Sequence, residues 1–177
     1  MVRVFKVHEQ SSTPADEAVL VNRTLQKQIV PAGSVGKVGA TAGWTVRGAN
    51  NSDLATVPAS QTASTLVVPI DILMAGDTIT SFHLVGQIES AGGAVTVDAD
   101  LRKMTAAAAD VTDASIGTIT QLSVTADTIM SASNTNKVLA TAEVVGADET
   151  FYVLVTATTA ASTDIALQAI AVTITKG

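Results

Sequence analysis

Three side chains with the chemistry of a serine hydrolase stand near the middle of the sequence. Ser81 and His83 are two residues apart, and Asp100 follows closely enough to return on a neighbouring strand. A serine, a histidine and an aspartate can serve as nucleophile, base and orienting acid. Here, however, the serine and histidine would lie roughly 6.5 to 7 Å apart along one strand, with parallel side chains. No strained turn aims the hydroxyl at the imidazole, so we expect no catalytic residues and no enzymatic activity.

Asp98 and Asp100 form a second candidate site, because residues two apart on a strand face the same way. Such a pair could supply the carboxylates of a glycosidase or part of a calcium site. Calcium takes about six to eight oxygen ligands, and the nearby acids Asp110 and Asp113 lack the spaced pattern of an ion-binding turn. We therefore expect no metal and no cofactor, and interpret the pair as part of a solvated acidic face.

The composition disfavours several other classes of function. The chain has no cysteine, so it forms no disulfide and has no cysteine nucleophile. Only three Phe, one Tyr and one Trp are present, few for a protein that stacks sugars or single-stranded nucleic acid on aromatic rings. No apolar run approaches the roughly 18 residues of a membrane span, and the first ten residues alternate instead of forming a signal-peptide core. We expect a soluble, unprocessed chain with no membrane partner.

Charge is unevenly distributed along the chain. Residues 1–47 contain six basic and three acidic residues, a net charge of +3, whereas residues 48–177 contain four basic and 13 acidic residues, a net charge of −9. One interpretation is a basic leading segment that lies on an acidic neighbour; the other is a chance scatter of solvated charges. The basic residues are neither dense nor interleaved with aromatic ones, so we expect no nucleic-acid partner.

The same boundary separates two kinds of sequence. Residues 29–53 contain five glycines, which indicate loops or an extended arm, and residues 11–30 fit either a short helix or a strand. From about Ser64 onward, strand-like runs recur between turn signals, at residues 64–70, 77–88, 94–103, 117–126, 136–145, 150–158 and 164–175. We therefore predict an N-terminal arm over residues 1–47 and an all-β body over residues 48–177, folded as an antiparallel β-sandwich or jelly roll.

The two runs on either side of the glycine pair at residues 92–93 are predicted to form a hairpin. With Ile88 opposite Val95, apolar side chains share one face of the hairpin and polar side chains share the other. On the polar face, His83 would lie opposite Asp100 and could form a hydrogen bond with it. Residues 104–113 are predicted to form a connecting loop with one turn of helix.

The last two runs are apolar on both faces and are interpreted as a second hairpin. In the first of them, Phe151, Val153 and Val155 alternate with Tyr152 and Leu154. Such a hairpin could be buried centrally under the N-terminal segment, or it could present one face to another subunit. A sandwich has one interior per sheet, so self-association is the more economical explanation.

Trp44 is the sole indole and lies in the glycine-rich arm. A lone tryptophan in such a setting more often packs than binds a ligand, so we expect it to anchor the arm against a sandwich or a neighbour. The predicted interface residues are therefore Trp44, Tyr152 and Leu154.

Two phrases of the body, "GDTITSFHLVGQIESAGGAVTVDADLRK" and "ADETFYVLVTATTAASTDIALQAIAVTIT", resemble small virion structural proteins of bacterial viruses, of the decoration (cement) or jelly-roll capsid type. The resemblance covers about residues 64–177. It implies a sandwich or jelly roll that decorates or builds a capsid, often as a trimer, with terminal arms that reach neighbours. It also implies location in the virion, with a viral shell protein and further copies of the chain as partners. No functional residue carries over from it.

The alternative from a different class is the receptor- or glycan-binding head of a phage fibre, with an enzyme as a third reading. A binding head would present a concave pocket lined with aromatic side chains. A shell component would present broad, flat contacts instead.

Overall fold

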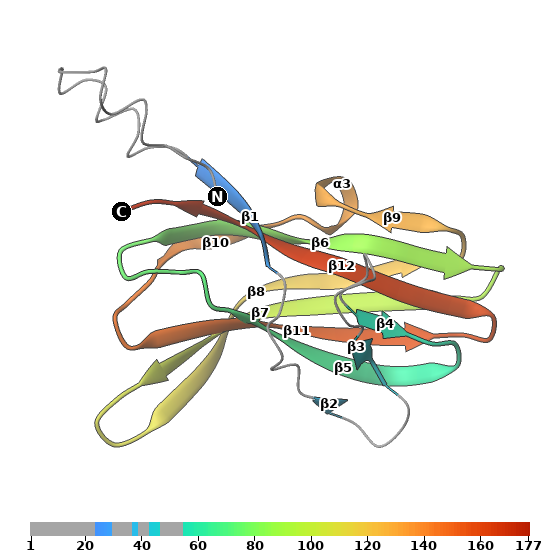
Figure 1. The fold of residues 1–177 in the computed structure, drawn as a ribbon, viewed down its shortest axis with the longest axis horizontal. Helices are drawn as coiled ribbons and strands as arrows, with labels where there is room; N and C mark the ends of the chain where they lie inside the picture. The colour runs from blue at the N-terminus through green and yellow to red at the C-terminus, as the bar shows by residue number, and fades with distance from the viewer. Residues whose placement is uncertain (1–23, 30–36, 39–42, 47–54) are drawn as a thin grey trace.

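The computed structural model describes residues 24–29, 37–38, 43–46 and 55–177 of the chain (Figure 1). The described part is all-β and antiparallel, as the sequence predicts. Its one described helix is α3, Ala132–Thr135. Its strands are β1 Thr24–Ile29, β2 Lys37–Val38, β3 Thr45–Val46, β4 Ala55–Val57, β5 Gln61–Ile70, β6 Thr78–Ser90, β7 Val95–Ala106, β8 Val111–Val124, β9 Thr128–Met130, β10 Lys137–Val144, β11 Glu149–Thr159 and β12 Thr163–Thr175.

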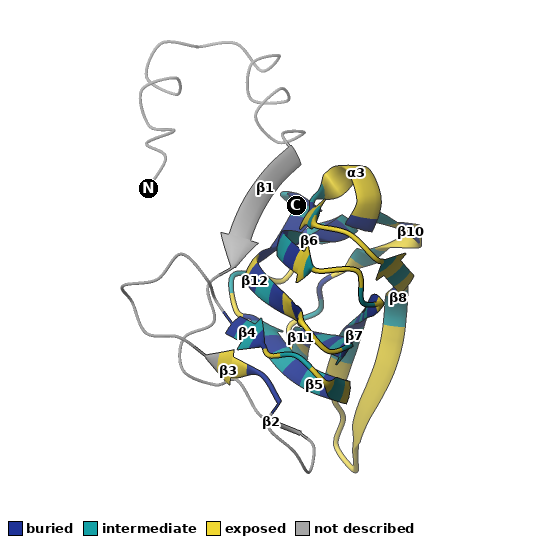
Figure 2. Cartoon of the chain, turned by 90° about the vertical axis from the view of Figure 1, so that its right-hand side faces the viewer, coloured by how far each residue is buried: buried dark blue, intermediate teal, exposed yellow. Residues whose placement is uncertain are grey.

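The strands form two sheets that pack face to face as a sandwich (Figures 1 and 2). Sheet A has the order β10-β6-β12-β4-β3, with β9 paired to β6 and β1 paired to β12. Sheet B has the order β2-β5-β11-β7-β8. Consecutive strands therefore often lie in different sheets, and the connections between them cross from one layer to the other.

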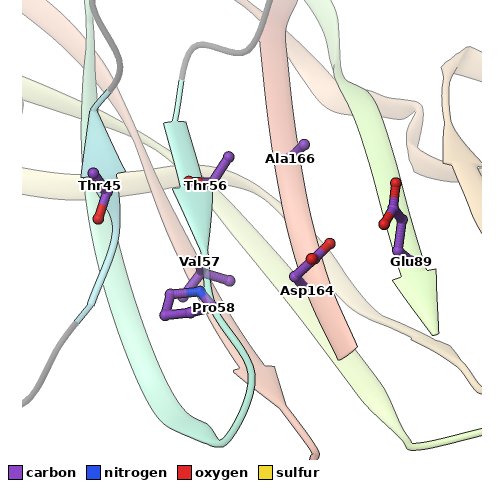
Figure 3. Close-up of a pocket in the computed structure, with 7 residues that line it drawn as sticks. All are labelled: Thr45, Thr56, Val57, Pro58, Glu89, Asp164 and Ala166. Atoms are coloured by element: carbon purple, nitrogen blue, oxygen red, sulfur yellow. The ribbon is translucent and has the colours of Figure 1, made fainter. Parts of the chain in front are cut away.

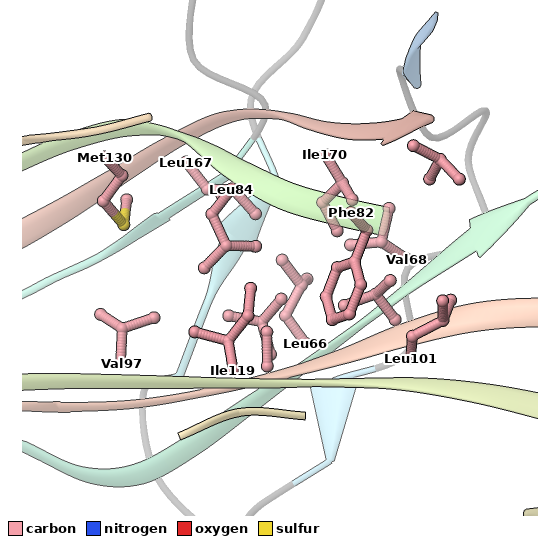
Figure 4. Packing of buried hydrophobic residues seen from close by; sticks show 14 of the residues in the cluster. Leu66, Val68, Phe82, Leu84, Val97, Leu101, Ile119, Met130, Leu167 and Ile170 are labelled. Atoms are coloured by element: carbon pink, nitrogen blue, oxygen red, sulfur yellow. The ribbon is translucent and has the colours of Figure 1, made fainter. Parts of the chain in front are cut away.

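Alternation of apolar and polar residues assigns each strand its core face. In β7, Val95, Val97 and Leu101 are buried, whereas Asp98 and Asp100 between them are partly exposed. The same period of two in β5, β6, β11 and β12 lines both inner faces with branched aliphatic side chains. These side chains interdigitate in one continuous core (Figure 4), which is what holds the two layers together.

The predicted hairpin of Ile88 opposite Val95 is wrong. Ile88 lies opposite Ile165 of β12 in sheet A, whereas Val95 lies opposite Thr159 of β11 and Val124 of β8 in sheet B. The connection between β6 and β7 is an arch across the end of the sandwich. An arch and a hairpin both place alternate residues toward one core, so the pattern specified the correct faces but not the pairing partners.

The connection between β11 and β12 is also an arch, so the second predicted hairpin is absent as well. The two arches support each other through backbone hydrogen bonds from Ala91 to the carbonyl of Ser162, 3.3 Å, and from Ala160 to the carbonyl of Ala94, 3.2 Å. The chain thus crosses between the two sheets twice at this end of the sandwich, once from β6 to β7 and once from β11 to β12, and the two crossings lie side by side.

The segment at residues 104–113 is not a loop with a helical turn. It continues β7 and β8 as a hairpin in which Met104 lies opposite Asp113 and Ala106 lies opposite Val111. Ala107 and Asp110 close the turn with two reciprocal backbone hydrogen bonds, 2.9 and 3.3 Å. The alanines of this turn are exposed and lie at the end of a hairpin that projects from the sandwich (Figures 1 and 2).

The described strands of the first 47 residues pair with the sheets of their own chain: β1 with β12, β2 with β5 and β3 with β4. Trp44 is 4% exposed, packs in the core, and donates from Nε1 to the carbonyl of Ser64, 3.1 Å. Trp44 therefore anchors its segment on its own sandwich. The division of the chain at residue 47 stays a prediction. The helix or strand predicted for residues 11–30 lies, up to position 23, outside the described residues.

Candidate functional site

The structure does not bring Ser81, His83 and Asp100 together. Ser81 and His83 lie on β6 in sheet A, while Asp100 lies on the outer face of β7 in sheet B. The apolar core separates the two sheets, whose packing distance is about 10 Å. The predicted hydrogen bond between His83 and Asp100 is therefore not formed. Burial lowers the pKa of His83 below its ordinary 6.5, which favours the neutral ring.

Asp98 and Asp100 both point outward, as the sequence predicts, but each binds the edge strand β8. Asp98 accepts a hydrogen bond from the backbone N–H of Gln121, 2.7 Å, where Gln121 has a φ of 44° and the strand bulges. Asp100 accepts from Thr118 Oγ1, 3.2 Å, and from the hydroxyl of Ser115. The two carboxylates fasten an irregular edge strand to its neighbour, which is a structural role.

Arg102 connects this edge to the centre of sheet B. Its Nη1 lies 2.7 Å from Asp100 Oδ2, and its Nε lies 3.1 Å from both Asp113 Oδ1 and the phenol of Tyr152. Tyr152 in turn donates to Asp113 Oδ2, 2.8 Å. The resulting ring of hydrogen bonds spans β7, β8 and β11 and fixes the orientation of the tyrosine.

The protonation states in this ring follow from its geometry. Hydrogen bonds from Arg102, and then from Tyr152, lower the pKa of the Asp113 carboxyl. Burial, followed by the hydrogen bond to Asp113, raises the pKa of Tyr152. Hydrogen bonds to Asp113 and Asp100 raise the pKa of Arg102. The ring is thus an anionic carboxylate, a neutral phenol and a cationic guanidinium whose hydrogen-bonding groups engage one another.

Tyr152 and Leu154, two predicted interface residues, lie beside each other on the same outer face. Leu154 is flanked by Val67, and Tyr152 is flanked by Pro69 on β5. All four side chains are half-buried and form an apolar row, bordered by Asp100 and Arg102 of β7. We call Val67, Pro69, Tyr152 and Leu154 the sheet B row. Trp44, the third predicted interface residue, is buried in its own chain and is not part of it.

A hollow of about 500 Å³ opens on the outer face of sheet A (Figure 3). Glu89 and Asp164 line it from directly opposite positions on β6 and β12, together with Thr45, Thr56, Val57, Pro58 and Ala166. The two carboxylates repel each other, as like charges on paired strands do. Glu89 Oε1 also accepts a hydrogen bond from Gln87 Nε2, 3.1 Å. Sequence reasoning missed this site because the two acids meet only through the pairing of β6 with β12, which no local pattern reveals.

A second ionic cluster joins the two sheets at the end of the sandwich opposite to the hollow. Lys103 of β7 lies 2.5 Å from Glu143 of β10 and 3.0 Å from Glu149 of β11. A backbone hydrogen bond from Gly146 and the contact with Lys103 lower the pKa of Glu149. Hydrogen bonds to the two glutamates raise the pKa of Lys103. The cluster stabilises the end of the sandwich as a set of mutually satisfied charges.

The described residues contain no group of three or more His, Asp or Glu arranged to hold a metal ion. Within the same residues, no helix has the length and apolarity needed to cross a membrane. Comparison with protein-family models, with curated proteins and with solved structures found no match to the chain.

Proposed function

We propose that the protein is a non-enzymatic structural subunit of a virion, a capsid decoration protein or a small jelly-roll capsid subunit. It associates with further copies of itself, with a trimer favoured, and binds a viral shell protein. The observation that carries this proposal is the sheet B row, an apolar strip containing Tyr152 and Leu154 on the outer face of a sandwich. The virion location and the viral shell partner are taken from the resemblance of residues 64–177 to virion proteins.

The sheet B row has the properties of an interface centre. Tyrosine is enriched at protein interfaces, and Arg102 and Asp113 hold Tyr152 in one orientation, so less side-chain entropy is lost on binding. Burying the row contributes roughly 25 cal/mol per Å² of apolar area before association costs. A stable contact covers about 800 Å² per partner, so the remaining strands of sheet B must take part.

The polar groups around the sheet B row are suited to form the polar rim of an interface. Asp98 and Asp100 are satisfied by β8, and Arg102 is satisfied by Asp100, Asp113 and Tyr152. A partner can therefore cover the row without leaving a newly buried charge unpaired, which is the main penalty at polar interfaces.

The receptor- or glycan-binding alternative would require a pocket with aromatic rings. The hollow of sheet A is lined by threonines, aliphatic side chains and the two acids Glu89 and Asp164, with no aromatic ring among the described lining residues. This lining favours the structural function over a carbohydrate site.

Two measurements test the proposal. Sedimentation velocity on the full chain at increasing concentration should show a defined oligomer, and electron microscopy of virus particles labelled with an antibody against the chain should place it on the shell. A chain that stays monomeric at tens of micromolar and does not bind particles would refute the proposal. A monomer that assembles only on particles would retain the shell function without independent self-association.

A further inference from the structure

β8 is the last strand of sheet B, and no other described strand pairs with its outer side. Residues 111–115 belong to the projecting hairpin, and all five are exposed (Figures 1 and 2). Their register with β7 is regular up to Ser115, which lies opposite Arg102. Beyond Ser115 the register shifts, and Gly117 lies against Leu139 of β10. We call residues 111–115 the β8 edge.

The turn of the hairpin determines which backbone groups the β8 edge presents. Ala107 and Asp110 are hydrogen-bonded to each other in both directions, so hydrogen-bonded and non-hydrogen-bonded pairs alternate from this turn along β7 and β8. Val111, Asp113 and Ser115 belong to pairs of the second kind, and their N–H and C=O groups point away from β7. The N–H of Val111 already donates to Asp110 Oδ1, 2.7 Å. Asp113 and Ser115 therefore each direct one donor and one acceptor toward the open side of the sheet.

The other described edges have the features with which native sheets prevent edge-to-edge pairing, namely short strands, bulges, lysine or proline. β2, β3, β4 and β9 have three residues or fewer, and the pairing of β10 with β6 is interrupted by a register shift. β1 contains Lys27, and β5 contains Pro69. The β8 edge is regular and contains no lysine, arginine or proline. An edge left open in this way is a template for a further strand.

Asp113, the single charged residue of the β8 edge, does not block it. Its carboxylate accepts hydrogen bonds from Arg102 Nε, 3.1 Å, and from the hydroxyl of Tyr152, 2.8 Å, which belong to β7 and β11. The carboxylate is thus held over sheet B, away from the open side, and the guanidinium offsets its charge. Two such edges can approach each other without bringing unpaired like charges together.

An identical edge is complementary to the β8 edge in one antiparallel register. With Asp113 of each copy opposite Ser115 of the other, these residues form four backbone hydrogen bonds across the joint. The small side chain of Ala114 then lies on the two-fold axis, opposite its own counterpart. The register uses every donor and acceptor that Asp113 and Ser115 direct outward.

The two neighbouring registers fit less well. A two-fold axis at Asp113 places two carboxylates on directly opposite residues, which is unfavourable. An axis at Thr112 requires the N–H of Val111, which is engaged by its own chain. The axis at Ala114 avoids both penalties.

We propose that the β8 edge pairs antiparallel with the β8 edge of a second copy of the chain, with Ala114 on the two-fold axis. The pairing joins the B sheets of the two copies into one continuous sheet. Val111 and Met104, which are exposed on the outer face beside the joint, lose contact with solvent when it forms. This contact is separate from the sheet B row, and it goes beyond the proposed function because it depends on neither a virion nor a shell protein.

The absence of cysteine from the chain allows a direct test on full-length protein. In Ala114→Cys the two sulfurs meet at the axis, where the Cα atoms of a non-hydrogen-bonded pair lie about 4.5 Å apart, within the range of a disulfide. The matched control is Thr112→Cys, also exposed and on the same face of the same hairpin, whose two sulfurs would lie roughly 13 Å apart along the joint. Under mild oxidation, Ala114→Cys should form a disulfide-linked dimer at least about tenfold faster than Thr112→Cys.

A backbone variant tests whether the contact is a strand pairing. Ser115→Pro removes an N–H that points to the open side, which an edge strand tolerates, and in the Ala114→Cys protein it should slow dimer formation several-fold. Ser115→Ala retains this N–H and should preserve the rate. Circular dichroism verifies that both variants are folded, and the comparison of the two cysteine positions decides the proposal without the proline variant if that variant unfolds.

Three results would overturn the proposal. Equal rates for the two cysteine variants would mean random collision, and a faster rate for Thr112→Cys would mean a different register. An unchanged rate in folded Ser115→Pro would mean that the backbone takes no part in the contact.

Leu154→Lys in the Ala114→Cys protein separates this contact from the sheet B row. A disulfide that persists while a larger oligomer is lost supports two distinct contacts, whereas loss of the disulfide would refute the β8 edge as an independent one. A disulfide that forms in a protein whose oligomer is unaffected by Leu154→Lys, or that does not bind virus particles, supports the β8 edge while the row or the virion function fails.

Discussion

Leu167 and Ile170 of β12 pack in the same core (Figure 4), although residues three apart on a regular strand point to opposite faces. The pairing with β6 explains how: Leu167 lies opposite Gly86 and Ala169 lies opposite Val85, so Gln168 is an extra residue. This β-bulge moves the second half of β12 onto the core side. Ile165 and Leu167 before the bulge and Ile170, Val172 and Ile174 after it therefore belong to one core face, although their spacing in the sequence suggests two.

The first prediction follows from this bulge. Ile170→Ala should destabilise the fold by about 2 to 5 kcal/mol, as expected for a fully buried aliphatic side chain. Thr173→Ala, on the outward face of the same strand, should cost about 0.5 kcal/mol or less. Urea unfolding of both variants checks this. Equal, small effects would mean that Ile170 points outward and that β12 has no bulge.

The faces of the strands could be predicted from the sequence, but their partners could not. Asp98 and Asp100 were placed correctly on an outer face because the period of two is local. Their binding to Gln121, Thr118 and Ser115 was missed because it depends on which strand lies alongside. Arches between sheets preserve the same alternation as hairpins within one sheet.

Bulges and long-range pairs were the other unpredictable features. A single extra residue such as Gln168 leaves no distinctive signal in sequence, yet it reverses the face of every residue after it. The opposed acids Glu89 and Asp164 likewise meet only after β6 and β12 have paired. Tyr152 and Leu154 could be proposed as interface residues because β11 contains no bulge at these positions. Both faces of this strand are therefore apolar in the structure as well as in the sequence.

The second prediction concerns acid stability. The pKa of Glu149 is held below its ordinary 4.5, first by the Gly146 N–H and then by Lys103. A carboxyl whose folded pKa is depressed stabilises the fold above its unfolded pKa and loses that contribution as pH falls through the folded value. Glu149→Gln should therefore lower the urea midpoint at pH 7, and the difference from the parent protein should shrink below about pH 4.5.

Asp148→Asn is the matched control for this prediction, because Asp148 is an exposed acid that directly precedes Glu149 in the sequence. It should change the midpoint little at either pH. If Glu149→Gln showed the same loss at pH 3 as at pH 7, the effect would come from packing and not from the charge.

The third prediction tests the sheet B row in solution. Leu154→Lys places a charge at the centre of the row and should lower the oligomeric state in sedimentation velocity without unfolding the sandwich, since Leu154 lies on the outer face. Ala140→Lys, an equal change in charge at an exposed position of β10, should leave the oligomer intact. Circular dichroism verifies that both variants are folded. An unfolded Leu154→Lys protein would show that the position belongs to a core, and an unchanged oligomer would remove the row from the interface.

The last prediction concerns the N-terminal segment, which the sequence marks as a dispensable arm up to residue 47. Two truncations separate its parts. A chain beginning at Thr24 retains β1 and Trp44, so it should unfold with the stability of the full protein while losing attachment to neighbours that depends on residues 1–23. A chain beginning at Gly48 lacks the Trp44 side chain, whose loss from a core costs about 3 to 5 kcal/mol, and lacks the pairing of β1 with β12. Attachment through the basic residues of the arm should weaken with salt as the Debye length falls from about 10 Å at 0.1 M to about 3 Å at 1 M, whereas attachment through its apolar residues should resist it. If the chain beginning at Gly48 unfolds cooperatively with unchanged stability, the arm extends to residue 47 as the sequence predicts. If it is destabilised and the chain beginning at Thr24 is not, the arm ends before β1 and residues 24–47 belong to the sandwich.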